Sequence, residues 1–109
     1  MADQDATMLA HNVYFALQDN SAEARQALIE ASKKYLTDHP GIVLFAVGEL
    51  ADYEREVNDR DFDVSLHVTF KDRAAHDAYQ ADGQHLEFIA AMKENWKKVR
   101  VFDADVTGG

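Results

Sequence analysis

Apolar and polar residues alternate most regularly in the middle of the chain. Between residues 62 and 70 the apolar members are Phe62, Val64, Leu66, Val68 and Phe70, and polar side chains stand between them. Side chains of a strand point alternately to its two faces, so this pattern predicts a strand with one buried face. The segment MLAHNVYFAL at 8–17 has the same period, which predicts another strand with His11 on the buried side.

A helix and a further strand are predicted between these two segments. Asn20 or Ser21 can cap a helix whose apolar stripe includes Leu28, and Pro40-Gly41 ends it. The run GIVLFAVGEL at 41–50 is apolar almost throughout, which is typical of a strand buried on both faces. A charged loop follows over residues 51–61 and is expected to be solvated.

The C-terminal part is predicted to contain two more helices and a last strand. Asp72 can cap the first of these helices, and we expect Gly83 to close it. The next helix begins near His85, and four residues at helical spacing form its buried face: His85, Ile89, Met92 and Trp96. The residues KKVRVFDAD at 97–105 indicate a short strand.

This order of elements predicts an α+β fold of the ferredoxin-like, split βαβ type, with all helices on one face of a four-stranded antiparallel sheet. The other face would expose an apolar patch that includes Tyr14 and Phe102. Packing this patch against a second copy is the simplest way to cover it. We therefore expect a single domain over 8–105 that forms a homodimer through this face, with flexible ends at 1–7 and 106–109.

Composition narrows the range of partners. Twenty acidic residues against eleven basic ones give a net charge of -9, which disfavours binding to a nucleic-acid backbone. The chain has no cysteine, so it has no disulfide and no thiolate chemistry, and no apolar stretch is long enough to span a bilayer. We expect a cytoplasmic protein that binds neither nucleic acid nor membrane.

The sequence lacks the common motifs for nucleotides and for catalytic zinc. No set of His, Asp and Glu has ligand spacing on a common rigid face, so we expect no metal and no organic or redox cofactor. His39 lies in a turn and His76 falls between the apolar positions of its helix. Both histidines are therefore expected at the surface.

His11, Tyr79 and His85 differ from these two because each lies on the predicted buried side of its element. A buried imidazole or phenol without a hydrogen-bond partner costs about 1–3 kcal/mol, so these side chains need partners in the core or in a ligand. His85 stands at the start of a helix, where the positive end of the dipole favours the neutral ring. An acid/base site and an ordinary polar core both fit the residues alone.

Five stretches resemble the stress-responsive dimeric α/β barrel family, usually called Dabb. They are HNVYFAL at 11–17, HPGIVLFAVGE at 39–49, FDVSLHVTFKDRAAHDAYQ at 62–80, HLEFI at 85–89 and VFD at 101–103. The resemblance implies a ferredoxin-like protomer and a dimer in which two sheets form a barrel.

The resemblance also bears on the candidate residues. Tyr79 and His85 keep the six-residue spacing of the family's tyrosine and histidine, while Asp82-Gly83 replaces its usual His-Pro pair. In a plant polyketide cyclase that is similar to this family, the equivalent pair performs an acid/base aldol cyclisation without a cofactor. His11 matches a typical strand histidine, and Val64 stands where that enzyme has a further pocket histidine.

Two hypotheses about function follow. The first is a stress-associated dimeric domain that binds a small organic molecule between helices and sheet, in a pocket lined by His11, Val64, Tyr79, His85 and Phe88. The alternative is a cofactor-independent enzyme of the aldol or enolisation type, with His85 as general base and Tyr79 as hydrogen-bond donor. A purely structural oligomer is a third possibility and would have no internal cavity.

Overall fold

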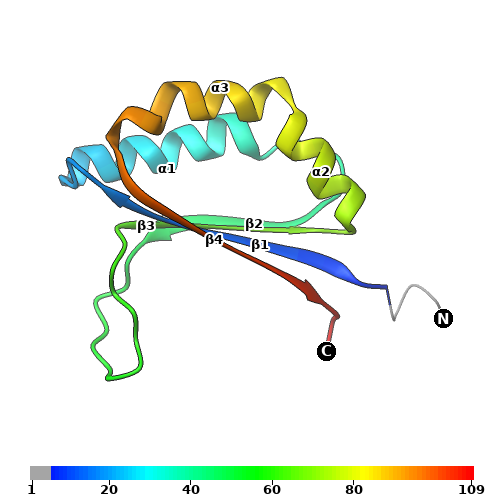
Figure 1. Cartoon of the computed structure of the whole chain (residues 1–109), viewed down its shortest axis with the longest axis horizontal. Helices are drawn as coiled ribbons and strands as arrows, with labels where there is room; N and C mark the ends of the chain where they lie inside the picture. Colours follow the sequence, from blue (N-terminus) through cyan, green and yellow to red (C-terminus); the bar gives the residue numbers. More distant parts are fainter. Residues whose placement is uncertain (1–5) are drawn as a thin grey trace.

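We describe residues 6–109 from a computed structural model (Figure 1). The elements in order are β1 (Met8–Leu17), α1 (Ala22–Leu36), β2 (Ile42–Glu49), β3 (Val64–Phe70), α2 (Arg73–Ala81), α3 (Gly83–Met92), a 3-10 turn (Lys93–Asn95) and β4 (Trp96–Val106). Within this range no helix has the length and apolar character needed to cross a membrane. Residues 1–5 of the segment predicted to be flexible lie outside the described range, and the predicted domain limits stay predictions.

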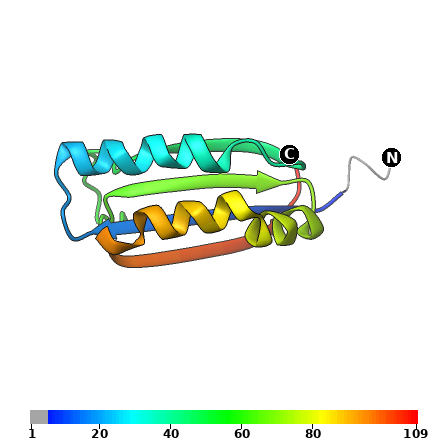
Figure 2. The same ribbon diagram turned by 90° about the horizontal axis from the view of Figure 1, so that it is seen from above.

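The four strands form one antiparallel sheet in the order β2-β3-β1-β4. All three helices lie on one face of this sheet, and the loop between β2 and β3 lies on the other side (Figure 1). Seen from above, α1 runs along the β2–β3 side and α3 along the β1–β4 side (Figure 2). This arrangement is the predicted ferredoxin-like fold.

The alternation of the two central strands is confirmed. On β3 the even residues Val64, Leu66, Val68 and Phe70 are at most 2% exposed. The odd residues of β1 point to the same face and are buried as well. The helices therefore cover the face that the sequence pattern marks as apolar.

α1 supplies the apolar cover over β2 and β3. Of the two predicted caps, Asn20 and Ser21, it is Ser21 that caps this helix, since its hydroxyl accepts a hydrogen bond from the Ala24 N–H. Leu28 and Leu36 are at most 1% exposed. The buried polar residue of this helix, Ser32, donates its hydroxyl to the Leu28 carbonyl oxygen at 2.8 Å. This half of the core is apolar, and its one polar side chain is hydrogen-bonded.

The junction between α2 and α3 differs from the prediction. Asp82, rather than Gly83, separates the helices: it ends α2, and its carboxylate caps α3 by accepting from the Gln84 N–H at 2.8 Å. Gly83 is consequently the first residue of α3. Trp96 does not share the helix face of His85 but begins β4, because the turn over Lys93–Asn95 ends the helix before it.

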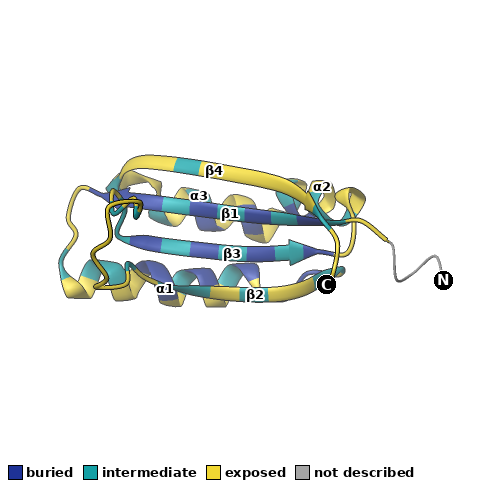
Figure 3. Ribbon diagram, turned by 90° about the horizontal axis from the view of Figure 1, so that it is seen from below, coloured by how far each residue is buried: buried dark blue, intermediate teal, exposed yellow. Residues whose placement is uncertain are grey.

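The two edge strands also depart from expectation. The last strand, expected to be short, has 11 residues, because β4 pairs with β1 along its whole length. The sequence predicts β2 to be buried on both faces, but Val43 is 58% exposed and Leu44 is 52% exposed. β2 lies at an edge of the sheet, and no helix in the described part of the chain covers its second face. Figure 3 shows this open face, where buried β1 and β3 lie between exposed edge strands.

Candidate functional site

A cavity of 380 Å³ lies between α2, α3 and the β1–β4 side of the sheet. Four of the five predicted ligand-binding residues line it, namely His11, Tyr79, His85 and Phe88. Apolar side chains of β1, α3 and β4 form most of the remaining wall, and its other polar members are His76, Gln80 and Asp103. An apolar pocket with a few converging polar groups is the usual form of a small-molecule site.

His11 faces the cavity because of its odd position on β1, and it is 4% exposed. The register of β1 with β4 places it directly opposite Asp103. A carboxylate only accepts hydrogen bonds, so the His11 Nδ1–H donates to Asp103 Oδ1, at 2.6 Å. Asp103 thereby orients the ring and leaves Nε2 of the neutral imidazole as an acceptor.

Tyr79 and His85 come from two helices that meet at Asp82. Because Asp82 ends α2 and begins α3 without an intervening loop, the ring centroids of Tyr79 and His85 lie only 4.7 Å apart. The Tyr79 ring also lies 6.0 Å from that of His11. Tyr79 is 2% exposed and His85 is 9% exposed. The structure thus brings the three predicted residues together beside one cavity.

Burial controls the protonation of these three groups. Desolvation lowers the pKa of His85 below its ordinary value, and the nearby His11 and His39 lower it further. Desolvation also lowers the pKa of His11, although the hydrogen bond to Asp103 opposes this change. It raises the pKa of Tyr79. Both imidazoles and the phenol are therefore neutral at pH 7.

One atom of His85 has no partner inside the described chain. Its Nδ1 is buried and makes no hydrogen bond there. The indole Nε1 of Trp96, on the same side of the sheet, is in the same situation. Buried polar atoms are nearly always paired in folded proteins, so unpaired ones beside a cavity point to a partner that the chain itself does not supply.

His39, predicted at the surface, is buried instead, with 9% exposure. Its ring centroid lies 5.0 Å from that of Tyr79, and its Nε2–H donates to the Tyr35 carbonyl oxygen at 3.2 Å. The prediction failed because the α1–β2 connection packs closely against α2. Gly41 has a φ of +89°, and a Cβ at this position would lie 2.5 Å from the Ala75 Cβ.

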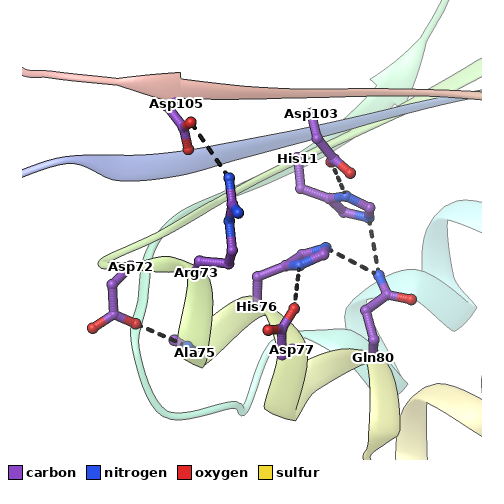
Figure 4. A network of polar contacts seen from close by, with 9 residues as sticks. All are labelled: His11, Asp72, Arg73, Ala75, His76, Asp77, Gln80, Asp103 and Asp105. Atoms are coloured by element: carbon purple, nitrogen blue, oxygen red, sulfur yellow. Dashed lines mark hydrogen bonds and ion pairs between the residues drawn. The ribbon is translucent and has the colours of Figure 1, made fainter.

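His76 is the second histidine that the surface prediction misplaced. Its side chain is 13% exposed, and its ring centroid lies 4.8 Å from that of His11. Gln80, one helical turn later, places its amide nitrogen 3.3 Å from His76 Nε2 and 3.5 Å from His11 Nε2 (Figure 4). Sequence reasoning missed His76, Gln80 and Asp103. The four-residue spacing of His76 and Gln80 on one helix is the signal that the sequence offered.

Val64 is placed differently from the other predicted pocket residues. Its side chain is fully buried in the core, and Val64 pairs with Phe15 and Glu49 within the sheet. It does not belong to the wall of the cavity. A direct contact between Val64 and a ligand therefore has no support in this geometry.

The premise that no metal-ligating set shares a rigid site also needs correction. His11, His76 and Asp103 each offer one ligand atom, and these atoms all lie within 4.8 Å of one another. The three residues belong to β1, α2 and β4. Ligand spacing along the sequence could not reveal them, because pairing of β1 with β4 and packing of α2 create the cluster.

A larger hollow of 540 Å³ lies on the open face of the sheet, between the strands and the loop that follows β2. Arg100 holds this loop by donating to Asp59 Oδ2 at 2.9 Å. The Tyr14 ring lies there between two others, with its centroid 5.0 Å from that of Phe62 and 5.7 Å from that of Phe102. No histidine of the described chain lines this hollow. We therefore place the candidate functional site in the cavity on the helix side, which has the histidines.

Three solved structures show how widely this fold is shared. A Dabb family protein with a ferredoxin-like fold from Mesorhizobium loti is 21% identical, with a TM-score of 0.77 over 94% of this chain and 99% of that chain. A dimeric ferredoxin-like protein of unknown function from Thermobifida fusca is 15% identical, with a TM-score of 0.76 over 93% and 92%. The hydroxynitrile lyase of Passiflora edulis is 18% identical, with a TM-score of 0.76 over 95% and 97%. At these identities the similarity establishes the fold.

The family of this chain follows from its amino-acid sequence. No curated protein sequence matches the chain. The model of the stress responsive A/B barrel domain, however, matches residues 9–106. This range includes all three helices and nearly the whole sheet. The chain therefore belongs to the stress-responsive A/B barrel domain family, Dabb.

Proposed function

We propose that this protein is a homodimer that binds a small organic molecule in the cavity between α2, α3 and the sheet. The observation that carries the proposal is the 380 Å³ cavity with a neutral His85 whose Nδ1 is unpaired. Small-molecule pockets usually measure about 300–1,000 Å³, and a ligand hydroxyl or carbonyl can supply the missing hydrogen bond once the side chains that shield Nδ1 shift on binding. The ligand is then largely apolar, with one polar group at the histidine end.

Filling the cavity tests this proposal. Val101 lines the cavity and is 50% exposed, so Val101→Trp can fill it without disturbing the deep core. Leu86 on α3 is 55% exposed and does not line it, which makes Leu86→Trp the matched control. A set of small phenols and aromatic ketones is titrated while amide NMR shifts are recorded. Saturable binding to the wild type and the control, and none to Val101→Trp, is expected; equal binding by both variants would place the ligand elsewhere.

The dimer part of the proposal rests on the open face of the sheet. Leu44 and Phe102 are each 52% exposed there, and no helix within residues 6–109 covers them. The relative from Thermobifida fusca is dimeric. A stable interface typically buries at least about 1,200 Å² in total, an area that a sheet face can provide.

A charge placed on the open face should separate the subunits. Phe102→Asp puts a carboxylate into the proposed interface, whereas Leu86→Asp puts one on the outer side of the helices. Sedimentation at micromolar concentration should give dimers for the wild type and Leu86→Asp and monomers for Phe102→Asp. A monomeric wild type at that concentration would refute the dimer.

Acid/base catalysis is the second candidate, and the contact between Tyr79 and a neutral His85 favours it. One protein of the same fold, from Passiflora edulis, is a hydroxynitrile lyase. The test is hydrogen–deuterium exchange at the α-carbon of an aromatic ketone, followed by NMR. A general base contributes about 10²–10⁴-fold, so His85→Phe should lose that factor while His67→Phe, on the other sheet face, keeps the rate. Exchange no faster than in buffer alone would exclude this function for the ketone used.

A further inference from the structure

Four polar side chains converge at one end of the cavity, and the proposed function does not use their arrangement. They are His11 from β1, His76 and Gln80 from α2, and Asp103 from β4 (Figure 4). One ligand atom from each of His11, His76 and Asp103 lies within 4.8 Å of the other two. All four residues also line the cavity, so the cluster borders space that an ion or a ligand can enter.

The imidazoles of His11 and His76 both point toward the Gln80 amide. Gln80 Nε2 lies 3.5 Å from His11 Nε2 and 3.3 Å from His76 Nε2, so both rings direct a nitrogen toward the same small space. Figure 4 shows both rings pointing at the end of the Gln80 side chain. These contacts are long for N–H···N hydrogen bonds, and a single amide group serves two acceptors. Gln80 therefore holds the two imidazoles only weakly, and a metal ion bound by both rings would be a stronger common partner.

Carboxylates stand next to the other nitrogen of each ring. Asp103 Oδ1 accepts from His11 Nδ1 at 2.6 Å, and Asp77 Oδ1 lies 3.4 Å from His76 Nδ1. Asp77 can act in this way on His76, because metal-bound histidines commonly have a carboxylate at the second ring nitrogen, which orients the ring and makes the ligating nitrogen more basic. Asp103 must instead give up its bond to the His11 Nδ1–H when it binds the ion. The two acidic side chains also lower the electrostatic cost of placing a cation here.

The cluster needs only a small adjustment to hold an ion. Bonds of about 2.0–2.2 Å in a tetrahedral centre place ligand atoms roughly 3.3–3.6 Å apart. A separation at the 4.8 Å limit must therefore close by about 1.2–1.5 Å. The Asp103 side chain is 41% exposed and can rotate, whereas the His11 side chain is 6% exposed and is held in place. The Gln80 amide can turn its oxygen toward the same space and act as a further donor.

We propose that His11, His76 and Asp103 form a binding site for a divalent transition-metal ion at this end of the cavity. Two imidazoles and one carboxylate suit zinc, cobalt or nickel better than calcium or magnesium, which prefer all-oxygen sites. Three protein ligands leave at least one coordination position open toward the cavity. That position takes water or an oxygen atom of a bound molecule.

Metal titration without any organic ligand tests this site independently of the proposed function. Protein without a histidine tag is stripped with a chelator and titrated with Zn²⁺ by calorimetry, and with Co²⁺ while the visible spectrum is recorded. The expected result is one equivalent bound, with the absorption of a cobalt centre that has nitrogen ligands. Binding of neither ion would overturn the metal site and leave the organic-ligand proposal standing.

Two matched pairs of variants locate the ion. His76→Leu removes a ligand, and His67→Leu removes a histidine from the other sheet face. Asp103→Asn weakens the carboxylate ligand, and Asp105→Asn changes a nearby β4 carboxylate that pairs with Arg73 instead. We expect at least about 10–100-fold weaker Zn²⁺ binding for His76→Leu and Asp103→Asn, and unchanged binding for both controls. Circular dichroism verifies that each variant is folded, and unchanged affinity in folded His76→Leu would overturn the proposal.

Discussion

The helix-covered face of the sheet consists of two halves with different character. Under α1, the buried side chains are apolar except for Ser32, whose hydroxyl is hydrogen-bonded at 2.8 Å. Under α2 and α3, the same face contains inward-facing histidines, a cavity of 380 Å³ and the unpaired His85 Nδ1. Natural cores rarely keep unpaired polar atoms unless function requires them. We therefore expect the stability of the fold to depend mainly on the α1 half, and the proposed ligand binding to depend on the α2–α3 half.

Truncation in the apolar half should have the largest effect. Leu28 is 1% exposed, so Leu28→Ala leaves a cavity in close-packed surroundings and should reduce the free energy of unfolding by about 2–5 kcal/mol. Urea denaturation measures this loss. Leu86→Ala, at a residue that is 55% exposed, should change it by no more than about 0.5 kcal/mol. Similar losses in both variants would break the proposed division of roles.

Acidification should destabilise the protein through its histidines. Burial lowers the pKa of His11, His67 and His85 in the folded state, so below the ordinary value of 6.5 the unfolded chain binds more protons. The free energy of unfolding should therefore be highest above pH 6.5. It should fall as the pH drops from 6.5 toward the lowered pKa values of the folded state. Urea denaturation at pH 7.5 and 5.5 measures the difference.

A variant of His85 measures how much of the pH effect comes from the cavity half, because His67 lies on the other sheet face. The lowered pKa of Asp59 starts from an ordinary value of 3.8, so this carboxylate does not respond between pH 7.5 and 5.5. His85→Phe removes one responding group and should therefore lose less stability over this interval than the wild type does. Equal or greater wild-type stability at pH 5.5 would contradict the proposed neutral histidines.

Within the cavity half, His11 should matter more for stability than His85. His11→Phe removes the 2.6 Å hydrogen bond to Asp103, whose side chain is 41% exposed and can regain water. The expected loss is about 0.5–1.5 kcal/mol, measured by urea denaturation at pH 7.5. Asp103→Asn keeps an acceptor for the His11 Nδ1–H and should cost less, so a larger loss in this variant would argue against the assigned bond.

The smallest change in stability is expected at His85. Its Nδ1 has no hydrogen-bond partner among residues 6–109, so His85→Phe removes a polar atom whose burial is not compensated by a hydrogen bond there. The free energy of unfolding at pH 7.5 should stay within about 1 kcal/mol of the wild-type value, while ligand binding is lost. A destabilisation well above that figure, with ligand binding kept, would make His85 a structural residue.

The elements that the sequence predicts correctly depend on local patterns. The period of two on β1 and β3 identifies their buried faces, the cap at Asp72 is confirmed, and the first helix is capped by Ser21, one of its two predicted caps. The sequence predicts the helix end at Gly83 because glycine commonly ends helices, but the residue between the two helices is Asp82, whose carboxylate caps α3. The prediction that β2 is buried on both faces was wrong. An apolar run does not distinguish a central strand from an edge strand with an exposed apolar face.

The sequence by itself determined the fold class and which face of each element is apolar, because periodicity and capping depend on residues close together in the chain. It also pointed to His11, Tyr79 and His85 through their positions on those faces. Only the tertiary structure decided that Asp103 meets His11, that His76 and Gln80 join them, and that Val64 stays in the core. Such contacts depend on strand register and on helix packing, which connect residues distant in sequence and leave no repeating pattern along it.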